Sequence, residues 1–342
     1  MKILFILKDR FYNNSHAKSY GLMNSAFQVA EYLETLGHTC KLVTVIDSNF
    51  IDKEVYQFKP DIVIIEALWV PGEKMKELLS IKRYKHIKWI VRIHSDIGFL
   101  SAETLASKYV SDYINLKNKN LIVALNNEKF NTYYSKAMRH KFTYLPNIIS
   151  IKNNDKFERN KLDNKIINIG CFGSLRILKN HAFQALCAID FAEKLGKKLY
   201  FHITTDISEE AQLKNPVLQN LKSIFENNKH ELVIHDWMNH QDFEHLIHHM
   251  DIGMQISFTE SFNIVAADFV NSGVPVIVSE AISWMPKIFR TSTINYKKVV
   301  NKMCFINRYR EFWFIKKTPM RHLLKYNKKA KTVWYDFMKK VN

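Results

Sequence analysis

Hydrophobic and polar positions follow two different periods through the first 150 residues. Short runs rich in Val, Ile and Leu, such as residues 2–7 and 61–65, have the length and β-branched character of buried strands. In residues 26–36 the apolar positions recur every three or four residues up to Gly37, which predicts an amphipathic helix with a glycine stop. Strands are predicted at residues 2–7, 40–45, 61–65, 88–93, 121–125 and 142–145. Their alternation with helices predicts βαβ units and a mostly parallel sheet.

The same alternation begins again after residues 149–165, a polar stretch rich in Lys, Asn and Asp that we interpret as an interdomain linker. Further strands are expected at residues 166–171, 198–204, 231–235, 251–258 and 274–278, and helices at 182–195, 217–225, 240–249 and 264–270. The prediction is an α/β protein of two Rossmann-like domains with a cleft between them. Its parts are a first domain (1–150), a linker (151–165), a second domain (166–290) and C-terminal helices (291–342).

The C-terminal segment differs from the rest in pattern and in charge. Strands disappear after Ser279, and helices are predicted at residues 296–310, 311–317 and 319–340, with aromatic residues among the basic ones. The chain of 342 residues has a formal net charge of +17. Residues 286–342 carry 16 Lys and Arg against two Asp and Glu, so this segment alone has a charge of +14. Such asymmetry predicts a polyanionic partner, either nucleic acid or an anionic membrane surface.

Composition also indicates the cellular compartment. A hydrophobic content of 47% argues against disorder, and no apolar run approaches the ~20 residues of a membrane span. The N-terminal MKILFIL is short and followed by charged residues, which favours a first buried strand over a secretory signal. The cysteines form no CxxC pair and are expected to be reduced, buried thiols of a cytoplasmic protein (host cytoplasm if phage-encoded). They are Cys40, Cys171, Cys187 and Cys304.

Two carboxylates stand out in the stretch from Asp251 to Ser279, which is predicted to be strand, loop, helix and strand. Glu260 lies in the loop, and Asp268 follows eight residues later, about two turns into the helix. Open α/β sheets bind ligands at such strand–helix crossovers, so the pair is a candidate ligand site. The alternative is that Glu260 is an ordinary N-terminal helix residue and Asp268 a solvated one.

A second candidate is the glycine-containing turn at residues 170–180, which leaves a strand and opens a helix. Backbone amides at a helix N-terminus attract anions, and Arg176 and Lys179 would add two positive charges beside them. Neutralising a departing diphosphate in this way is also catalytic. Taken by itself, a Gly-x-x-Gly turn with basic residues is a weak signal; upstream of Glu260 and Asp268 it becomes stronger.

Together these motifs resemble retaining nucleotide-sugar glycosyltransferases of the GT-B architecture (family 4-like), which carry an E-S/G-F-x-x-x-x-x-E signature and a basic pair after the first strand of the second domain. The resemblance implies a nucleotide diphosphate sugar donor, specifically a UDP-sugar, with no obligatory metal or other cofactor, and C-terminal helices that cross back to the first domain. The implied catalytic residues are Arg176, Lys179, Glu260 and His94, and the implied donor-binding residues are Gly21, Gly173, Ser174, Ser261, Phe262 and Asp268.

The chain departs from the family pattern at three positions. Asp268 stands where the family has a glutamate that holds the ribose hydroxyls, so the carboxylate has a shorter reach. Gly21, expected in the long loop after the first strand, replaces a glycine pair beside the donor phosphates. Asn147 lies in a Pro-Asn-Gly element whose glycine is Ile148 here, and is interpreted as a hinge or cap. His94 matches a histidine that touches the transferred sugar, and Asp96 is expected to orient it.

The distribution of basic residues indicates which class of acceptor to expect. Basic patches in the first domain, the acceptor side in GT-B enzymes, together with the basic tail, favour a hydroxymethylated base in DNA; bacteriophage enzymes that glycosylate such bases have similar architecture, length and basicity. One alternative is an envelope glycan precursor (lipopolysaccharide, capsule or teichoic acid) at an anionic membrane. Another is a non-catalytic nucleic-acid-binding module, and a third is that the tail is a solvated helical face. The acceptor-side residues are Lys82, Arg83, Lys85, Arg139 and Lys141.

Other chemistries find little support. His245 and His249 have the i, i+4 spacing of metal ligands, but no third ligand is evident, so a solvated helix face is the simpler interpretation. Neither a G-x-S-x-G elbow nor a GxxxxGK[ST] phosphate loop occurs. The sequence therefore favours sugar transfer over ester or nucleotide triphosphate hydrolysis.

Overall fold

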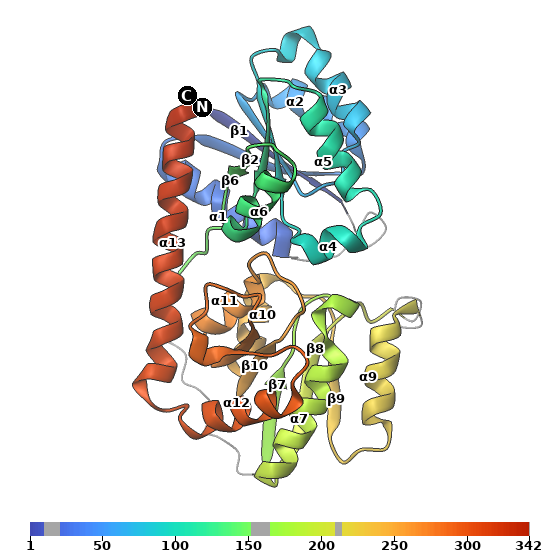
Figure 1. Cartoon of the computed structure of the whole chain (residues 1–342), viewed down its shortest axis with the longest axis vertical. Helices are drawn as coiled ribbons and strands as arrows, with labels where there is room; N and C mark the ends of the chain where they lie inside the picture. The colour runs from blue at the N-terminus through green and yellow to red at the C-terminus, as the bar shows by residue number, and fades with distance from the viewer. Residues whose placement is uncertain (10–20, 152–164, 209–213, 342) are drawn as a thin grey trace. The chain divides into compact units, whose positions relative to one another are not determined.

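A computed structural model describes residues 1–9, 21–151, 165–208 and 214–341. The described chain forms two compact units (Figure 1). One unit, here the N-terminal unit, comprises the described residues up to 150 together with residues 327–341. The other, the C-terminal unit, comprises the described residues from 151 to 326.

The N-terminal unit is built on a six-stranded sheet in which every strand pair is parallel and the order is β2-β1-β3-β4-β5-β6. The strands are β1 (Lys2–Lys8), β2 (Thr39–Val45), β3 (Ile62–Glu66), β4 (Lys88–Ile93), β5 (Leu121–Leu125) and β6 (Thr143–Tyr144). The helices are α1 (Gly21–Thr35), α2 (Ile51–Phe58), α3 (Gly72–Ser80), α4 (Ile97–Ala102), α5 (Ala106–Asn115) and α6 (Glu128–Ala137), with short 3-10 turns η1 (Ser48–Phe50) and η2 (Lys82–Tyr84). All five residues of β3 are buried, as a strand covered on both faces requires.

The C-terminal unit repeats this design with a second parallel sheet, in the order β12-β11-β10-β7-β8-β9. The strands are β7 (Ile166–Gly170), β8 (Lys198–Thr204), β9 (Glu231–His235), β10 (Ile252–Gln255), β11 (Val276–Ser279) and β12 (Arg290–Thr291). The helices are α7 (His181–Leu195), α9 (Pro216–Glu226), α10 (His240–His248), α11 (Ile264–Asn271) and α12 (Tyr296–Arg308), with 3-10 turns η3 (Ile177–Lys179) and η4 (Lys287–Phe289). Strand β12 was not expected, because two residues are too short to show a pattern in sequence.

Two glycines let a helix approach the middle of this second sheet. Gly170 of β7 and Gly253 of β10 are paired across the sheet, and the ring of Phe269 in α11 lies against both. A Cβ atom added at Gly253 would lie 2.8 Å from that ring. The absence of side chains at these two positions therefore fixes how closely α11 packs, and with it the position of the residues around Asp268.

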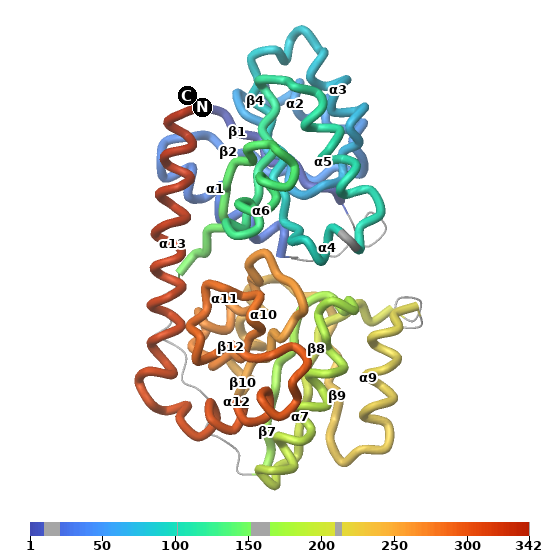
Figure 2. The backbone as a smooth tube through the Cα atoms, viewed as in Figure 1, coloured from blue at the N-terminus to red at the C-terminus, as the bar shows by residue number. Residues whose placement is uncertain are grey.

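The last helix, α13 (Trp313–Val341), is continuous where two helices had been expected (Figure 2). Pro319 lies inside it and lacks the N–H for one helical hydrogen bond, a defect that costs roughly 3 kcal/mol. A single buried stripe nevertheless runs along its length and outweighs this local break. The buried residues of the stripe are Ile315, Leu323, Ala330, Trp334 and Met338. The helix contributes to both units, since residues 327–341 cluster with the N-terminal one.

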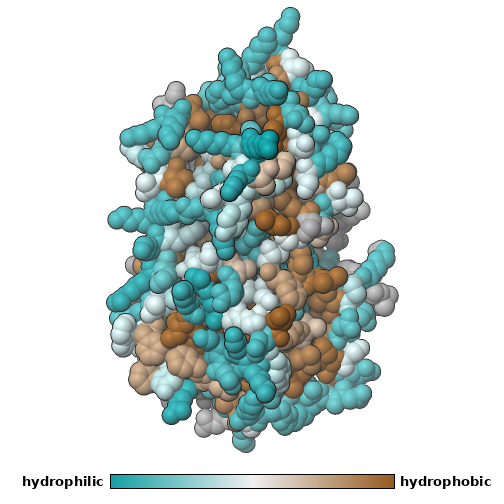
Figure 3. All heavy atoms as spheres, in the orientation of Figure 1, coloured by the Kyte–Doolittle hydropathy of each residue, from teal (hydrophilic) through white to brown (hydrophobic). Residues whose placement is uncertain are grey.

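The predicted α/β class with two doubly wound sheets and a returning C-terminal helix is confirmed. Among the described residues, no helix is both long and apolar enough to cross a membrane. Hydrophilic side chains cover most of the face drawn in Figure 3, and the hydrophobic areas between them are separate.

Candidate functional site

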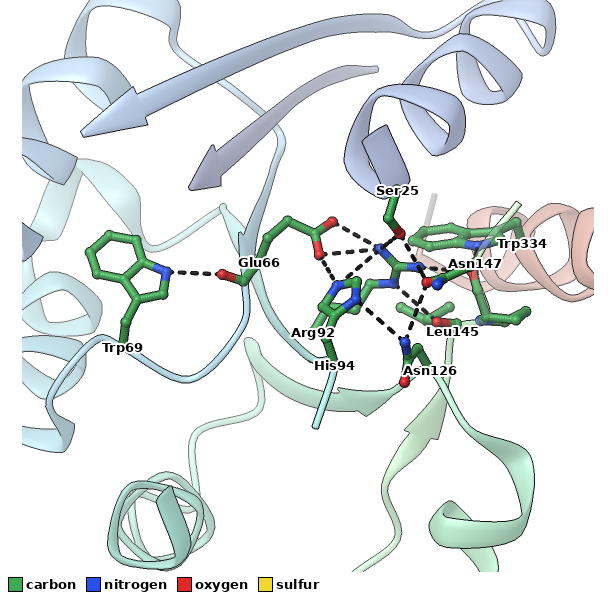
Figure 4. Close-up of polar contacts among 10 residues, drawn as sticks. Ser25, Glu66, Trp69, Arg92, His94, Asn126, Leu145, Asn147 and Trp334 are labelled. Carbon is green, nitrogen blue, oxygen red and sulfur yellow. Dashed lines mark hydrogen bonds and ion pairs between the residues drawn. The ribbon is translucent and has the colours of Figure 1, made fainter. Parts of the chain in front are cut away.

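Polar side chains gather where neighbouring strands of the N-terminal sheet end (Figure 4). Glu66 is the last residue of β3, Arg92 is the penultimate residue of β4, and His94 follows that strand. Asn126 follows β5, and Asn147 comes shortly after β6. Parallel strands end at a common edge, so these five residues, here called the buried cluster, meet at the carboxyl edge of the sheet, where α/β proteins place their ligands.

Arg92 is the centre of the buried cluster and is fully buried. Its Nη1 donates to both carboxylate oxygens of Glu66, at 3.0 and 3.1 Å, and Glu66 is the residue paired with it across β3 and β4. Its Nη2 donates to Oδ1 of Asn147 at 2.6 Å, and its Nε donates to the carbonyl of Leu145 at 3.0 Å. The guanidinium lies 5.5 Å from the ring centre of Trp334 in α13. A buried charge is tolerated here because all of its nitrogens are satisfied.

His94 is held on both ring nitrogens. Nε2 forms a short hydrogen bond with the Glu66 carboxylate, and Nδ1 lies 3.3 Å from the side-chain amide of Asn126. Burial and the adjacent Arg92 lower the pKa of His94, and these effects outweigh the opposing influence of Glu66. Burial would raise the pKa of Glu66, but Arg92 and His94 hold it below its ordinary value. We therefore assign a neutral imidazole that donates from Nε2 to an ionised carboxylate.

Only His94 of this cluster was singled out from the sequence for chemistry, and it follows β4 as expected. Glu66 and Arg92 were missed, although a charged residue inside or closing an apolar strand is a usable signal. Asn147 is not the expected hinge or cap: it is buried and also accepts a hydrogen bond from the Ser25 hydroxyl at 2.9 Å. The side chain of Asp96 caps α4 by accepting from the backbone N–H of Ile97, whereas Glu66 orients His94.

In the C-terminal unit, Lys179 and Glu260 form an ion pair with an Nζ to Oε1 distance of 2.5 Å. Lys179 ends the 3-10 turn after β7, and Glu260 lies in the loop after β10. These two strands are neighbours, and from them the sheet continues in opposite directions. The pair therefore bridges the topological switch point of the sheet, the usual ligand position in doubly wound folds. The side chain of Lys179 keeps 19% of its surface exposed, against 6% for Glu260.

Asn263 holds the loop that carries Glu260. Its side-chain amide donates to Oε1 of Glu260 at 2.8 Å and to the side-chain oxygen of Gln255 at 2.9 Å. Its own Oδ1 accepts from the backbone N–H of Ala266 and so caps α11. Asn263 adopts a φ of +69°, a left-handed conformation that asparagine tolerates better than most residues. Glu260 thus precedes the helix as a buried, positioned carboxylate, unlike the ordinary helix residue considered as the alternative.

Asp268 is the fifth residue of α11, so it lies little more than one turn into the helix, not two. The helix starts at Ile264, as expected, with Asn263 as its N-cap. Asp268 is buried, which rules out the solvated alternative, and its carboxylate lies 3.3 Å from Nε2 of His240 in α10. The other nitrogen of His240 lies 3.6 Å from Glu244.

The remaining donor-side predictions lie around the same sheet edge. Arg176 is exposed just before η3. Gly173 has a φ of +112°, which favours glycine, and its N–H donates to the hydroxyl of Thr204 at the end of β8. Ser174 and Ser261 are half-buried. The ring of Phe262 instead packs within the unit, with its centre 5.5 Å from that of Trp284, so it is a packing residue in this structure.

The other predicted residues are on the surface of the N-terminal unit. Gly21 is the first residue of α1 and not part of a loop, because the helix begins five residues before the expected start. Arg83 pairs with Asp52 at 3.0 Å. The exposed basic residues fall on two segments, one after α3 and one after α6; they are Lys82, Arg83, Lys85, Arg139 and Lys141. Within the described ranges, no three His, Cys, Asp or Glu side chains are grouped as metal ligands.

Comparison with solved structures identifies the class of fold as that of the GT-B glycosyltransferases. A sucrose-phosphate synthase from Thermosynechococcus elongatus has a TM-score of 0.73 at 12% identity, with 98% of each chain covered. The trehalose-6-phosphate protein of E. coli bound with UDP-2-fluoro glucose has a TM-score of 0.68 at 9% identity, covering 100% of this chain and 99% of that one. S. aureus TarM in a complex containing UDP has a TM-score of 0.61 at 12% identity, covering 82% and 55%.

These likenesses establish the fold over the whole chain. No protein-family model matches the sequence, and no curated protein matches it either.

Proposed function

We propose that this protein is a glycosyltransferase that moves a sugar from a nucleotide diphosphate sugar, with UDP as the nucleotide, to an acceptor hydroxyl with retention of configuration. The observation that carries the proposal is the Lys179–Glu260 ion pair at the switch point of the C-terminal sheet, with buried Asp268 on the adjoining helix. The fold likeness to a protein solved with UDP-2-fluoro glucose supports the same assignment.

Lys179 would stabilise the leaving diphosphate. Breaking the glycosidic bond to a nucleotide leaves negative charge on the diphosphate, and a preorganised ammonium lowers the energy of that transition state. Glu260 holds the Lys179 ammonium in place before the donor binds, so little reorganisation is needed during the reaction. Exposed Arg176 and the open turn at Gly173 would supply a second cation and a close backbone approach.

Asp268 would bind the ribose of the donor. A carboxylate accepts hydrogen bonds from both hydroxyls of a ribose, and these charge-assisted bonds are stronger than neutral ones. His240 lies beside Asp268 and would fix the orientation of its carboxylate.

For the acceptor, we keep the hydroxymethylated base of DNA as the leading hypothesis, because the excess positive charge of the C-terminal segment favours a polyanion. An envelope glycan precursor is the alternative. Two of the similar structures are named for sugar-phosphate synthesis, so a phosphorylated sugar belongs in the same test.

The test is mass spectrometry of acceptors after incubation with a panel of UDP-sugars. The acceptors are duplex DNA with and without hydroxymethylcytosine, glucose 6-phosphate, and liposomes carrying an envelope glycan precursor. We expect one acceptor class to gain the mass of a single sugar, and nuclear magnetic resonance of the product to show retention. Absence of both transfer and donor hydrolysis with every UDP-sugar would contradict the proposal and favour a non-catalytic module.

A further inference from the structure

A separate hollow of about 820 Å³ lies in the C-terminal unit, between the ends of β11 and β12 and the first turns of α12. Its size falls within the range of small-molecule sites. None of the residues assigned above to the donor or the acceptor lines it. The hollow is therefore distinct from the residues assigned to the donor and the acceptor.

The lining of the hollow is predominantly positive. Arg290, Lys298 and Lys302 contribute three cations, against one carboxylate from Glu280. Arg290 is fixed by hydrogen bonds from its guanidinium to the carbonyls of Met285 and Ser283, which keeps its charge at this wall. Lys298 and Lys302 have no carboxylate partner among the described residues, and they lie one turn apart on α12. An anion would be attracted by all three cations.

Two further observations indicate a ligand that accepts hydrogen bonds. Thr291 lines the hollow and is only 5% exposed, yet its hydroxyl finds no partner within the described part of the chain. Buried hydroxyls are normally satisfied. The first turn of α12 contains no acidic residue and two lysines, although the positive end of a helix disfavours cations. Burial also lowers the pKa of Lys302. A bound anion would relieve each of these costs.

We propose that this hollow binds a small phosphate monoester, such as a sugar phosphate or a nucleotide. The phosphate would contact Lys298 and Lys302 on the first two turns of α12. The Thr291 hydroxyl is enclosed by protein, and a change of the Thr291 rotamer would bring it to a phosphate oxygen as a donor. Exposed apolar side chains, Ile294 and Phe258, form part of the wall and offer a surface for the sugar ring or base. This site extends beyond the proposed sugar transfer and does not depend on it.

Calorimetric titration of the full chain with inorganic phosphate, glucose 6-phosphate and AMP tests the site. The Lys298→Gln/Lys302→Gln variant should bind phosphate at least about tenfold more weakly, since it loses two charge-assisted hydrogen bonds. The matched control is Lys287→Gln/Lys297→Gln, which removes the same charge from exposed lysines that do not line the hollow. This control and Lys179→Ala should both keep the phosphate affinity within about twofold.

The alternative results are distinct. Equal weakening in the control pair would show a nonspecific charge effect, and loss in Lys179→Ala alone would assign phosphate to the donor site; either overturns the proposal. Unmeasurable binding of all three compounds by the wild type, or tight binding of a short DNA duplex alone, would overturn it too. The Thr291→Val variant provides a second measurement, because it should weaken phosphate binding without changing the charge.

Discussion

The two units place ionised residues at equivalent edges of their sheets but surround them differently. In the N-terminal unit, Arg92 and Glu66 are fully buried, and protein groups occupy every nitrogen of the guanidinium and both nitrogens of His94. In the C-terminal unit, Lys179 remains partly exposed beside Glu260 at the switch point. A saturated network stabilises one arrangement of the chain, whereas a partly exposed cation can still bind a ligand. We therefore propose donor chemistry for the second region and a positioning role for the first.

The Arg92→Met variant tests the first half of this comparison, namely that the buried cluster stabilises the fold. Removing one partner of a buried ion pair leaves Glu66 uncompensated, and we expect a loss of about 3–5 kcal/mol in the free energy of unfolding. Urea denaturation followed by circular dichroism measures it. Arg83→Met is the control, since it removes an exposed ion pair with Asp52 and should leave the midpoint nearly unchanged. Equal midpoints for the two variants would show that the cluster does not stabilise the fold.

The Asp268→Asn variant tests whether the second region binds the ribose of the donor. Loss of the negative charge should raise the KM for the donor about tenfold, because charge-assisted hydrogen bonds to the ribose are weakened. Asp268→Glu restores the carboxylate and should recover part of the affinity, whereas Asp242→Asn, on an exposed position of α10, should not change KM. An unchanged KM in Asp268→Asn would remove this residue from the donor site.

Lowering the pH tests the protonation states on which the comparison rests. The pKa of His94 is lowered in the folded protein, so its contribution to stability is complete above about pH 6.5 and is lost as the pH falls through the folded value. Glu66, whose pKa is also lowered, adds a loss at still lower pH. Unfolding free energies measured from pH 7.5 to 5 should therefore fall, and fall less in His94→Gln.

Buried histidines of the C-terminal unit contribute with the same sign. The pKa values of His181 and His202 are lowered to about 3 by burial, so each should account for about 1 kcal/mol of the loss at pH 5.5. His202→Gln should reduce the decline by that amount. A pH-independent free energy in the wild type would contradict both assignments.

The sequence predicted elements whose pattern is local and missed those set by distant partners. The apolar runs of β3 and β4 were evident, but the Glu66–Arg92 pair requires knowing that these strands are neighbours in register. Lys179 and Glu260 were found separately, and their contact across 81 positions comes from the sheet order. Pro319 suggested a helix break, yet the buried stripe of α13 overrides it. Phe262 fitted a signature but packs in the unit, since a motif does not specify side-chain direction.

The most direct test of the central claim is turnover of the Lys179→Ala variant with the donor and acceptor identified by the mass-spectrometric panel. If Lys179 stabilises the leaving diphosphate, kcat should fall by about 10²–10³ at a temperature where circular dichroism shows that the variant is still folded. Lys194→Ala is the matched control: it removes an exposed lysine paired with Asp190 and should retain full turnover. A Lys179→Ala enzyme as active as this control would contradict the account.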